Sequence, residues 1–403
     1  MKKIIQQLVI ILLGVQLASC NNELEVSDTK DISTEDVYHV GIDEALTTAD
    51  MFFAQLKSPN ASTRSIDKRK VSRMEIINTN AKTRGSGESY NKELYLVNYE
   101  EDNGFALLSS DKRLCPIYAI ADSGHLETSD TIYNKPLALF FKNVMNDISY
   151  EENNPTTFEH DGQVFIDSAQ VAPLLWAGTR KWSQKAPYNE YCFTENGKQA
   201  VAGCSSVSIA QIMSFYSWPQ KIDDISLSWR SMKGNRSQNK IARLLARLGK
   251  SDMLATNYGE SSSGSSDANY MRTFIGMGYY TPNEITVFSE SDVRFALDNA
   301  NKVAGAGPVL TLGRSITGSG HSWVIDGYAQ NVTNKNSYST LFHCVWGWGG
   351  KADGYFYWKG YIGGHSDALD VNDYDFSSDK KHLGSANEYI LLYYMTNFVP
   401  NKK

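Results

Sequence analysis

Several features that define other protein classes are missing from this chain of 403 residues. Positive charge is not in excess: 39 Lys and Arg against 45 Asp and Glu give a net charge of −6, which provides no basic surface for nucleic acid. No CxxC or HExxH motif occurs, so a zinc site has little support. After residue 20, no apolar run is long enough to cross a membrane.

Cysteine is also scarce, and its positions are scattered. The five cysteines are Cys20, Cys115, Cys192, Cys204 and Cys344. The last four show no tight spacing of the kind that marks a disulfide framework, even though exported proteins can form disulfides. At least one of them is therefore expected to be present for its reactivity.

The N-terminus has the pattern of an export signal. Lys2 and Lys3 precede an apolar run over residues 4–17, and small residues follow before Cys20. Residues 17–20 resemble a bacterial lipobox, in which the cysteine is lipidated and becomes the first residue of the mature chain. This pattern predicts a signal peptide over 1–19 and a lipid anchor at Cys20 in the bacterial cell envelope. The alternative is a plain signal peptide cleaved beside a chance cysteine.

Composition divides the rest of the precursor. Residues 20–60 are polar and acidic, which predicts a tether. Alternating and apolar runs then predict a small α+β unit that ends near residue 150. Its expected elements are strands at 94–99, 104–109 and 116–120 and an amphipathic helix at 137–148.

The second half has helices first and strands afterwards. This order predicts an α+β enzyme with two lobes. The expected helices are 203–218 and 241–248, and the expected strands are 308–312, 321–328, 340–348, 354–358 and 389–394.

Gly203 and Cys204 open the first of these helices. The positive end of a helix dipole lowers the pKa of a cysteine placed there, which favours the reactive thiolate. The glycine lets another chain approach the sulfur. Cys204 is therefore a candidate nucleophile, and the alternative is a small buried cysteine that only packs.

A cysteine nucleophile needs a base, and His321 has the most suitable setting. Glycines at 318 and 320 leave room beside it, and a predicted strand follows. The alternative is a polar residue at the edge of that strand. His343 is a weaker candidate because it is next to Cys344 on one strand, where neighbouring side chains point to opposite faces.

The third feature is the run Trp346-Gly347-Trp348-Gly349-Gly350. Two tryptophans around a glycine can shield a polar contact from water, although core packing beside a tight turn is the alternative. Together and in this order, the three features resemble the streptopain family of papain-like bacterial cysteine proteases. The motifs that carry the resemblance are 203–204 with 210–213, 320–321 with 324–327, 346–350 with 353–354, the stretch 184–189 and the loop 258–265.

The resemblance implies a papain-like fold with two lobes, behind an N-terminal α+β inhibitory pro-domain at 61–168. The catalytic domain would be 169–403, with Cys204 on the central helix and His321 on the β lobe. Gln184 would donate to the oxyanion together with the Cys204 backbone N–H. Trp346 would shield or orient the imidazolium, and Ser263, Gly264 and Ser265 would form a substrate-side loop. No metal or cofactor is required.

One position departs from the family pattern. The family usually has asparagine before the first tryptophan, and here that residue is Val345, which has no polar side-chain group. Two substitutes could orient His321: the Asp326 carboxylate, or Trp346 with backbone carbonyls.

The interpretation is a secreted cysteine endopeptidase made as a zymogen. Its partners would be protein or peptide substrates and its own pro-domain as an intramolecular inhibitor, with a lipid anchor as the sole membrane contact until activation releases the enzyme. The alternative is a catalytically weak surface lipoprotein that uses the same fold to bind proteins. Retention of Cys204, His321 and Gln184 together favours the enzyme, since a binding module needs none of them.

Overall fold

The computed structural model describes most of the chain after the first 37 residues. The described residues are 38–57, 68–78, 93–112, 114–126, 140, 144, 148, 165–280, 282–315, 320–333, 337–358 and 390–402. Among them, no helix has the length and apolar character needed to span a bilayer. The signal peptide and the lipobox expected at residues 1–20 lie outside the described residues.

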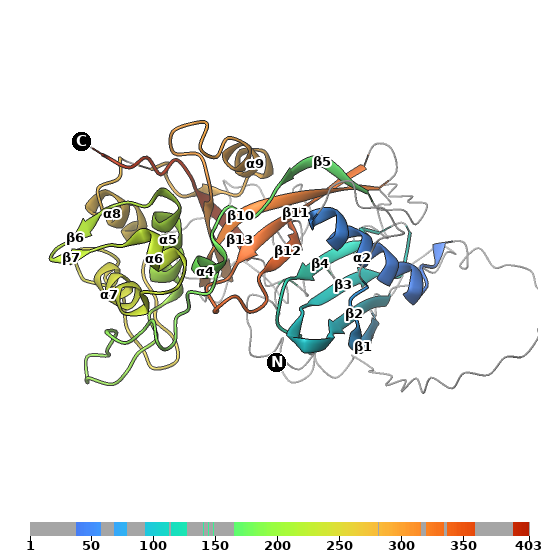
Figure 1. Cartoon of the computed structure of the whole chain (residues 1–403), viewed down its shortest axis with the longest axis horizontal. Coiled ribbons are helices and arrows are strands. Elements are labelled where there is room, and N and C mark those ends of the chain that lie inside the picture. The colour runs from blue at the N-terminus through green and yellow to red at the C-terminus, as the bar shows by residue number, and fades with distance from the viewer. Residues whose placement is uncertain are drawn as a thin grey trace, which may run out of the picture.

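A sheet of eleven strands runs through the molecule (Figure 1). Ten strands follow the order β1-β2-β3-β4-β12-β11-β10-β9-β13-β8, and β5 pairs with β10 off this path. Its strands are β1 (Val71–Asn78), β2 (Glu93–Tyr99), β3 (Phe105–Ser109), β4 (Ile117–Ala121), β5 (Phe165–Val171), β8 (Thr286–Val287), β9 (Val309–Ser315), β10 (Gly320–Thr333), β11 (Ser337–Val345), β12 (Gly354–Tyr357) and β13 (Ile390–Met395). The strands predicted at 94–120 and from 308 onward are thereby confirmed.

The helices gather mainly at one end of this sheet (Figure 1). They are α4 (Ala177–Arg180), α5 (Cys204–Tyr216), α6 (Trp229–Lys233), α7 (Gln238–Leu248) and α8 (Ala268–Gly276), with the hairpin β6 (Lys221–Ile222) and β7 (Ile225–Ser226). A further helix, α9 (Glu290–Asp298), covers β9 and β10. The result is a helical lobe beside a β lobe, and the helices predicted at 203–218 and 241–248 are confirmed as α5 and α7.

The helix α5 lies where the helical lobe meets the β lobe. Its residues from Ser205 to Ser214 are buried, and it packs on β10 and on α7. A helix with apolar and small residues on every side is stable only when surrounded in this way. This position fixes the first residue of α5, Cys204, against the edge of the β lobe.

The N-terminal unit consists of strands β1 to β4, a short turn η3 (Glu100–Asp102), and the helix α2 (Ile42–Lys57). Side chains of β2 alternate: Leu94 and Leu96 enter one apolar cluster, and Tyr95 and Val97 enter another with Phe52 of α2. Both faces of β2 are covered, which explains why its sequence is apolar almost throughout.

The helix α2 corrects the tether expected over residues 20–60. Residues 42–57 are helical, and Ala45, Ala49 and Phe52 are buried against the sheet. Their spacing of four and three residues places them on one helical face. The acidic and polar residues between them gave the segment the composition of a tether.

The helix predicted at 137–148 is represented by three described residues. Phe140, Val144 and Ile148 are helical and buried, and they enter the same apolar cluster as Phe356 of β12. Their spacing of four residues is that of a single helical face, as the amphipathic pattern predicted.

The N-terminal unit and the β lobe share one sheet through the pairing of β4 with β12. Gly354 lies opposite Ala121 in this pair, and a Cβ at Gly354 would lie 2.3 Å from the carbonyl oxygen of Ile120. Glycine is therefore required for this close approach. The boundary expected between residues 168 and 169 falls inside β5, which pairs with β10 on both sides of a register shift.

Candidate active site

Cys204 is the first residue of α5, and among the described cysteines it alone is partly exposed, while Cys115, Cys192 and Cys344 are buried. The residue before it, Gly203, has a φ of 87°, which an L side chain rarely adopts. Cys204 thereby lies at the helix N-terminus, where the first backbone N–H groups have no partner within the helix.

Gly203 also explains the close approach of the predicted substrate-side loop. A Cβ at Gly203 would lie 3.3 Å from the carbonyl oxygen of Ser263. The Ser263 hydroxyl donates to the carbonyl of Val201 at 2.7 Å and accepts from the N–H of Gly259 at 3.0 Å. Ser263 is therefore fixed beside Gly203 and Cys204.

The two residues after Ser263 are held by the neighbouring backbone. Gly264 exchanges two hydrogen bonds with Asn257, at 2.9 and 3.2 Å, and the Ser265 hydroxyl donates to the carbonyl of Leu254. A Cβ at Gly264 would meet nothing within 4 Å. The loop is thus anchored on both sides, with open space at its glycine.

His321 lies near the start of β10 and is partly exposed. Its Nε2 is 3.0 Å from the carbonyl oxygen of Trp346. Because a carbonyl accepts, Nε2 carries the proton of this bond, and Nδ1 is the nitrogen left to exchange a proton with the thiol. The ring centroid lies 5.2 Å from that of Trp348 and 6.2 Å from that of Trp346.

The electrostatics favour an ionised Cys204. Burial raises the pKa of this thiol, but the positive charge of His321 and hydrogen bonds from the His321 ring and from Ser322 outweigh it and lower the pKa to about 6. The thiolate is therefore present above pH 6 and is lost as the pH falls through that value. At neutral pH, Cys204 is therefore mostly a thiolate, with the His321 ring beside it.

Ser322 is a site residue that sequence reasoning missed. It follows His321 on β10, is buried, and its hydroxyl lies 3.0 Å from that of Ser208. Ser208 is four residues after Cys204 and shares its helical face. No motif signals this role, since the contact depends on how β10 packs on α5.

Two alternatives were open for orienting His321 in the absence of asparagine at position 345. Asp326 is not the orienting group: its Oδ1 lies 2.6 Å from Nδ1 of His343, and its Oδ2 accepts from the N–H of Leu175 at 3.0 Å. Val345 itself is buried and packs in the helical-lobe core. The hydrogen bond to Trp346 O agrees with the second alternative.

Trp346 is held in place through its backbone N–H and through its indole N–H. Its N–H donates to the Asp353 carboxylate at 3.0 Å, and its indole N–H donates to the carbonyl of Ala352 at 2.9 Å. The Trp348 ring stacks on it with 5.4 Å between centroids. This fixes the carbonyl that orients His321, so Asp353 acts on the site through Trp346.

His343 takes part in a buried charge cluster and is not the partner of the Cys204 thiol. Burial lowers its pKa, but the carboxylates of Asp326 and Asp122 outweigh this and raise it to about 10. Asp122 follows β4 of the N-terminal unit, and its Oδ2 lies 3.2 Å from His343 Nε2 and 3.3 Å from Arg180. This cluster is an ionic contact between the N-terminal unit and the catalytic half.

The backbone of Gln184 is joined to the segment that precedes Cys204. Its carbonyl accepts from the N–H of Ala202 at 2.8 Å, two residues before Cys204. The preceding Ser183 bridges to Trp348, and Gly349 donates to the carbonyl of Trp182 at 3.2 Å. The segment that carries Gln184 is thus joined to both the cysteine and the tryptophan loop.

Gln184→Ala is expected to lower kcat by about 10²-fold with KM nearly unchanged, because one oxyanion donor acts mainly in the transition state. Initial rates over a range of concentrations of a peptide substrate measure both constants. Gln184→Glu is the matched control of similar size that removes the amide donor. A change confined to KM would mean that Gln184 binds substrate instead.

No metal site competes with this chemistry among the described residues, where no group of three His, Cys, Asp or Glu side chains could hold an ion. The structure therefore brings Cys204, His321, Trp346 and the loop at Ser263 together, places Gln184 beside them, and directs Asp326 elsewhere. Cys20 lies outside the described residues.

Two family models match the chain. One, described as the Peptidase C10 family, matches residues 182–356, and the other, described as Spi protease inhibitor, matches residues 34–148. The second match begins before α2, in accord with the correction to the tether. Together they cover the N-terminal unit and most of the helical and β lobes, leaving out β5, α4 and β13.

Individual relatives agree with these matches. Streptopain of Streptococcus pyogenes is 24% identical over 362 residues, which are 78% of this chain and 83% of that protein. The thiol protease/hemagglutinin PrtT of Porphyromonas gingivalis is 24% identical over 299 residues, 65% of this chain but 33% of its own length. The solved structure of prointerpain A from Prevotella intermedia covers 79% of this chain and 99% of its own, with 19% identity and a TM-score of 0.50, which shows a shared fold.

Proposed function

Because this chain belongs to the Peptidase C10 family, the streptopain family of cysteine proteases, we propose that it is a secreted endopeptidase in which Cys204 is the nucleophile and His321 the general acid and base. Its fold is papain-like, and a zymogen-type inhibitor pro-domain precedes the catalytic half. The observation that carries the assignment of residues is the His321 ring beside a partly exposed thiol whose pKa is lowered to about 6.

The residues perform acyl transfer in two halves. The Cys204 thiolate attacks the peptide carbonyl carbon, and the electron pair of the C=O bond moves to an oxygen that faces the Cys204 N–H and the Gln184 amide. When the C–N bond breaks, the His321 imidazolium gives its proton to the leaving amine. Water then attacks the thioester, His321 accepts a proton from that water, and the acid and the thiolate are released.

The direct test is the pH dependence of thiol alkylation. Cys204 of the folded protein is expected to react with iodoacetamide at a rate that rises to half its maximum near pH 6, well below the pH of about 8.5 at which a free cysteine is half ionised. Peptide mass mapping identifies the labelled residue. Half-maximal labelling of Cys204 at pH 8 or above would contradict the thiolate–imidazolium pair.

Export and anchoring are part of the proposal and rest on residues 1–20. An apolar run that ends at Cys20 supports lipidation of that cysteine, and a chain with two or more acyl groups stays at a membrane. We propose that the precursor is lipid-anchored to the bacterial cell envelope.

If Cys20 is acylated, the precursor is expected to enter the detergent phase of a two-phase extraction, whereas Cys20→Ser is expected to stay in the aqueous phase. The increase in mass of the N-terminal peptide provides the second measurement. Cys115→Ser is the control, because that buried cysteine lies within the folded unit. Equal partitioning of wild type and Cys20→Ser would leave a plain signal peptide.

Activation is proposed to occur by cleavage between residues 151 and 172. The polar composition of 151–167 is typical of exposed linkers that proteases cut. Of residues 151–167, only 165–167 are among the described residues. Because β4 and β12 are paired and Asp122 contacts His343, the N-terminal unit is expected to stay bound after the cut until it is displaced or degraded.

A further inference from the structure

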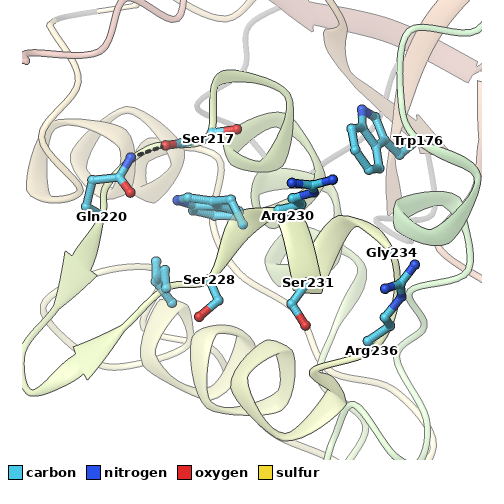
Figure 2. Close-up of a pocket in the computed structure, with 10 residues that line it drawn as sticks. Trp176, Ser217, Gln220, Ser228, Arg230, Ser231, Gly234 and Arg236 are labelled. Carbon is cyan, nitrogen blue, oxygen red and sulfur yellow. Dashed lines mark hydrogen bonds between the residues drawn. The ribbon is translucent and has the colours of Figure 1, made fainter.

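A pocket of about 660 Å³ lies on the helical lobe (Figure 2). It is bounded by α6, by the turn that follows α5, and by Trp176 just before α4. Its volume falls within the range of about 300–1,000 Å³ that is usual for ligand sites. Nothing in the catalytic scheme uses it.

The pocket is separate from the catalytic pair. Ser217, which lines it, is the residue that ends α5, whereas Cys204 begins that helix. A helix of 13 residues is about 20 Å long at 1.5 Å per residue. A ligand in this pocket therefore lies at the opposite end of α5 from the thiol.

Positive charge gathers at this pocket. Arg230 and Arg236 both line it, and no acidic residue does. Neither guanidinium has an ion-pair or hydrogen-bond partner within the part of the chain that the structure describes. Elsewhere on this lobe an arginine such as Arg247 is paired with two carboxylates, Asp223 and Asp252. The two guanidinium groups are thus available to a ligand.

A third cation and an aromatic face adjoin the arginines. The Lys233 ammonium lies 4.8 Å from the centre of the Trp176 ring and donates to the Ser217 hydroxyl at 3.1 Å. Trp176 is 50% exposed, although large aromatic side chains are usually covered. On a chain with a net charge of −6, this combination forms a local site for an anionic group that carries some apolar surface.

We propose that this pocket is an exosite that binds an acidic segment of the protein substrate, with carboxylates on Arg230 and Arg236 and an apolar side chain on Trp176. The proposal rests on the proposed protease function. A pocket of about 660 Å³ is far larger than a single anion, and carboxylates match two forked guanidinium groups. Roughly six extended residues would span the distance of about 20 Å from such a segment to the scissile bond.

The first experiment measures binding without catalysis, in the full-length Cys204→Ala protein. The probe is a fluorescein-labelled dodecapeptide of alternating glutamate and glycine with one central phenylalanine, and its anisotropy is followed at low salt. The control probe has glutamine in place of every glutamate. We expect the glutamate probe to bind at least tenfold more tightly, since each charge-assisted hydrogen bond lost costs a factor of about ten or more.

The double variant Arg230→Gln/Arg236→Gln is expected to remove the difference in affinity between the two probes. Trp176→Ala is expected to weaken the binding of both probes. Both arginines are exposed, so the variant should melt at the wild-type temperature by circular dichroism. Arg243→Gln is the matched control, since this exposed arginine of α7 lies 3.8 Å from Asp224 and outside the pocket. Equal binding of the two probes, or an equal loss in Arg243→Gln, would overturn the proposal.

The second experiment measures turnover in the active enzyme. Two kinds of peptide substrate share one cleavage sequence. The short kind has this sequence alone. The long kind also carries an acidic extension, placed six residues before the scissile bond in one peptide and six residues after it in another. The extension is expected to lower KM at constant kcat, and the double arginine variant to lose this advantage while cleaving the short peptide normally. If inorganic phosphate bound as tightly as the dodecapeptide and displaced it, the assignment to a protein segment would be overturned. If wild type cleaved neither peptide, the protease proposal would fail while the binding result stood.

Discussion

Cys204→Ala is expected to abolish peptide hydrolysis while leaving the fold intact. The side chain lies at the start of α5, partly exposed, and alanine is a good helix former that fills less space than cysteine. No other described cysteine can replace the lost nucleophile, because Cys115, Cys192 and Cys344 are buried. The loss should therefore reach the detection limit of a casein assay.

Cys192→Ala is the matched control for this variant. Burial raises the pKa of the Cys192 thiol, so it remains protonated and unreactive at neutral pH. The control is expected to keep most of its activity and to lose some stability through the small cavity. Full activity in Cys204→Ala, or an equal loss in both variants, would show that Cys204 is not the nucleophile.

The same variant tests activation. The Cys204→Ala precursor incubated alone is expected to stay uncut between residues 151 and 172, and to be cut by added wild-type enzyme when processing occurs in trans. N-terminal sequencing and mass measurement identify the fragment, which should be near 26 kDa at the usual average mass per residue. An intact precursor as active as residues 170–403 alone would exclude the zymogen proposal.

His321→Ala is expected to lower kcat/KM by a factor of about 10³ or more, since both the proton transfer and the activation of the nucleophile are lost. The positive ring is the main group that opposes the effect of burial on Cys204. Without it, burial dominates and the thiol pKa rises. The pH of half-maximal alkylation of Cys204 should therefore shift upward from about 6.

His125→Ala is the control for this second variant. His125 is an exposed histidine of the N-terminal unit, 3.4 Å from Asp102, and its loss should leave the alkylation profile of Cys204 in the full-length precursor unchanged. The combined shift of rate and pH profile distinguishes a base from a merely structural residue. An unchanged alkylation profile in His321→Ala, with activity lost, would contradict the direct pairing of His321 with Cys204.

The proposed catalytic pair is recognisable in the sequence because each member has a local signature. Cys204 follows a glycine at the start of an apolar helix, and His321 follows a glycine at the start of a strand. Most strands could be predicted because their buried residues alternate or run together, as in β2. By contrast, α2 was missed, since its buried face consists of small and scattered residues among acidic ones.

The sequence alone therefore predicted most of the strands, the helices α5 and α7, and the candidate thiol and imidazole, since these depend on residues close together along the chain. Only the tertiary structure decided the partners: Trp346 O orients His321, and Asp326 and Asp122 enclose His343. These contacts join residues up to 221 positions apart, and spacing along the chain carries no information about such pairs. Sheet topology sets them, because the pairing of β4 with β12 and the packing of α5 on β10 bring distant side chains together.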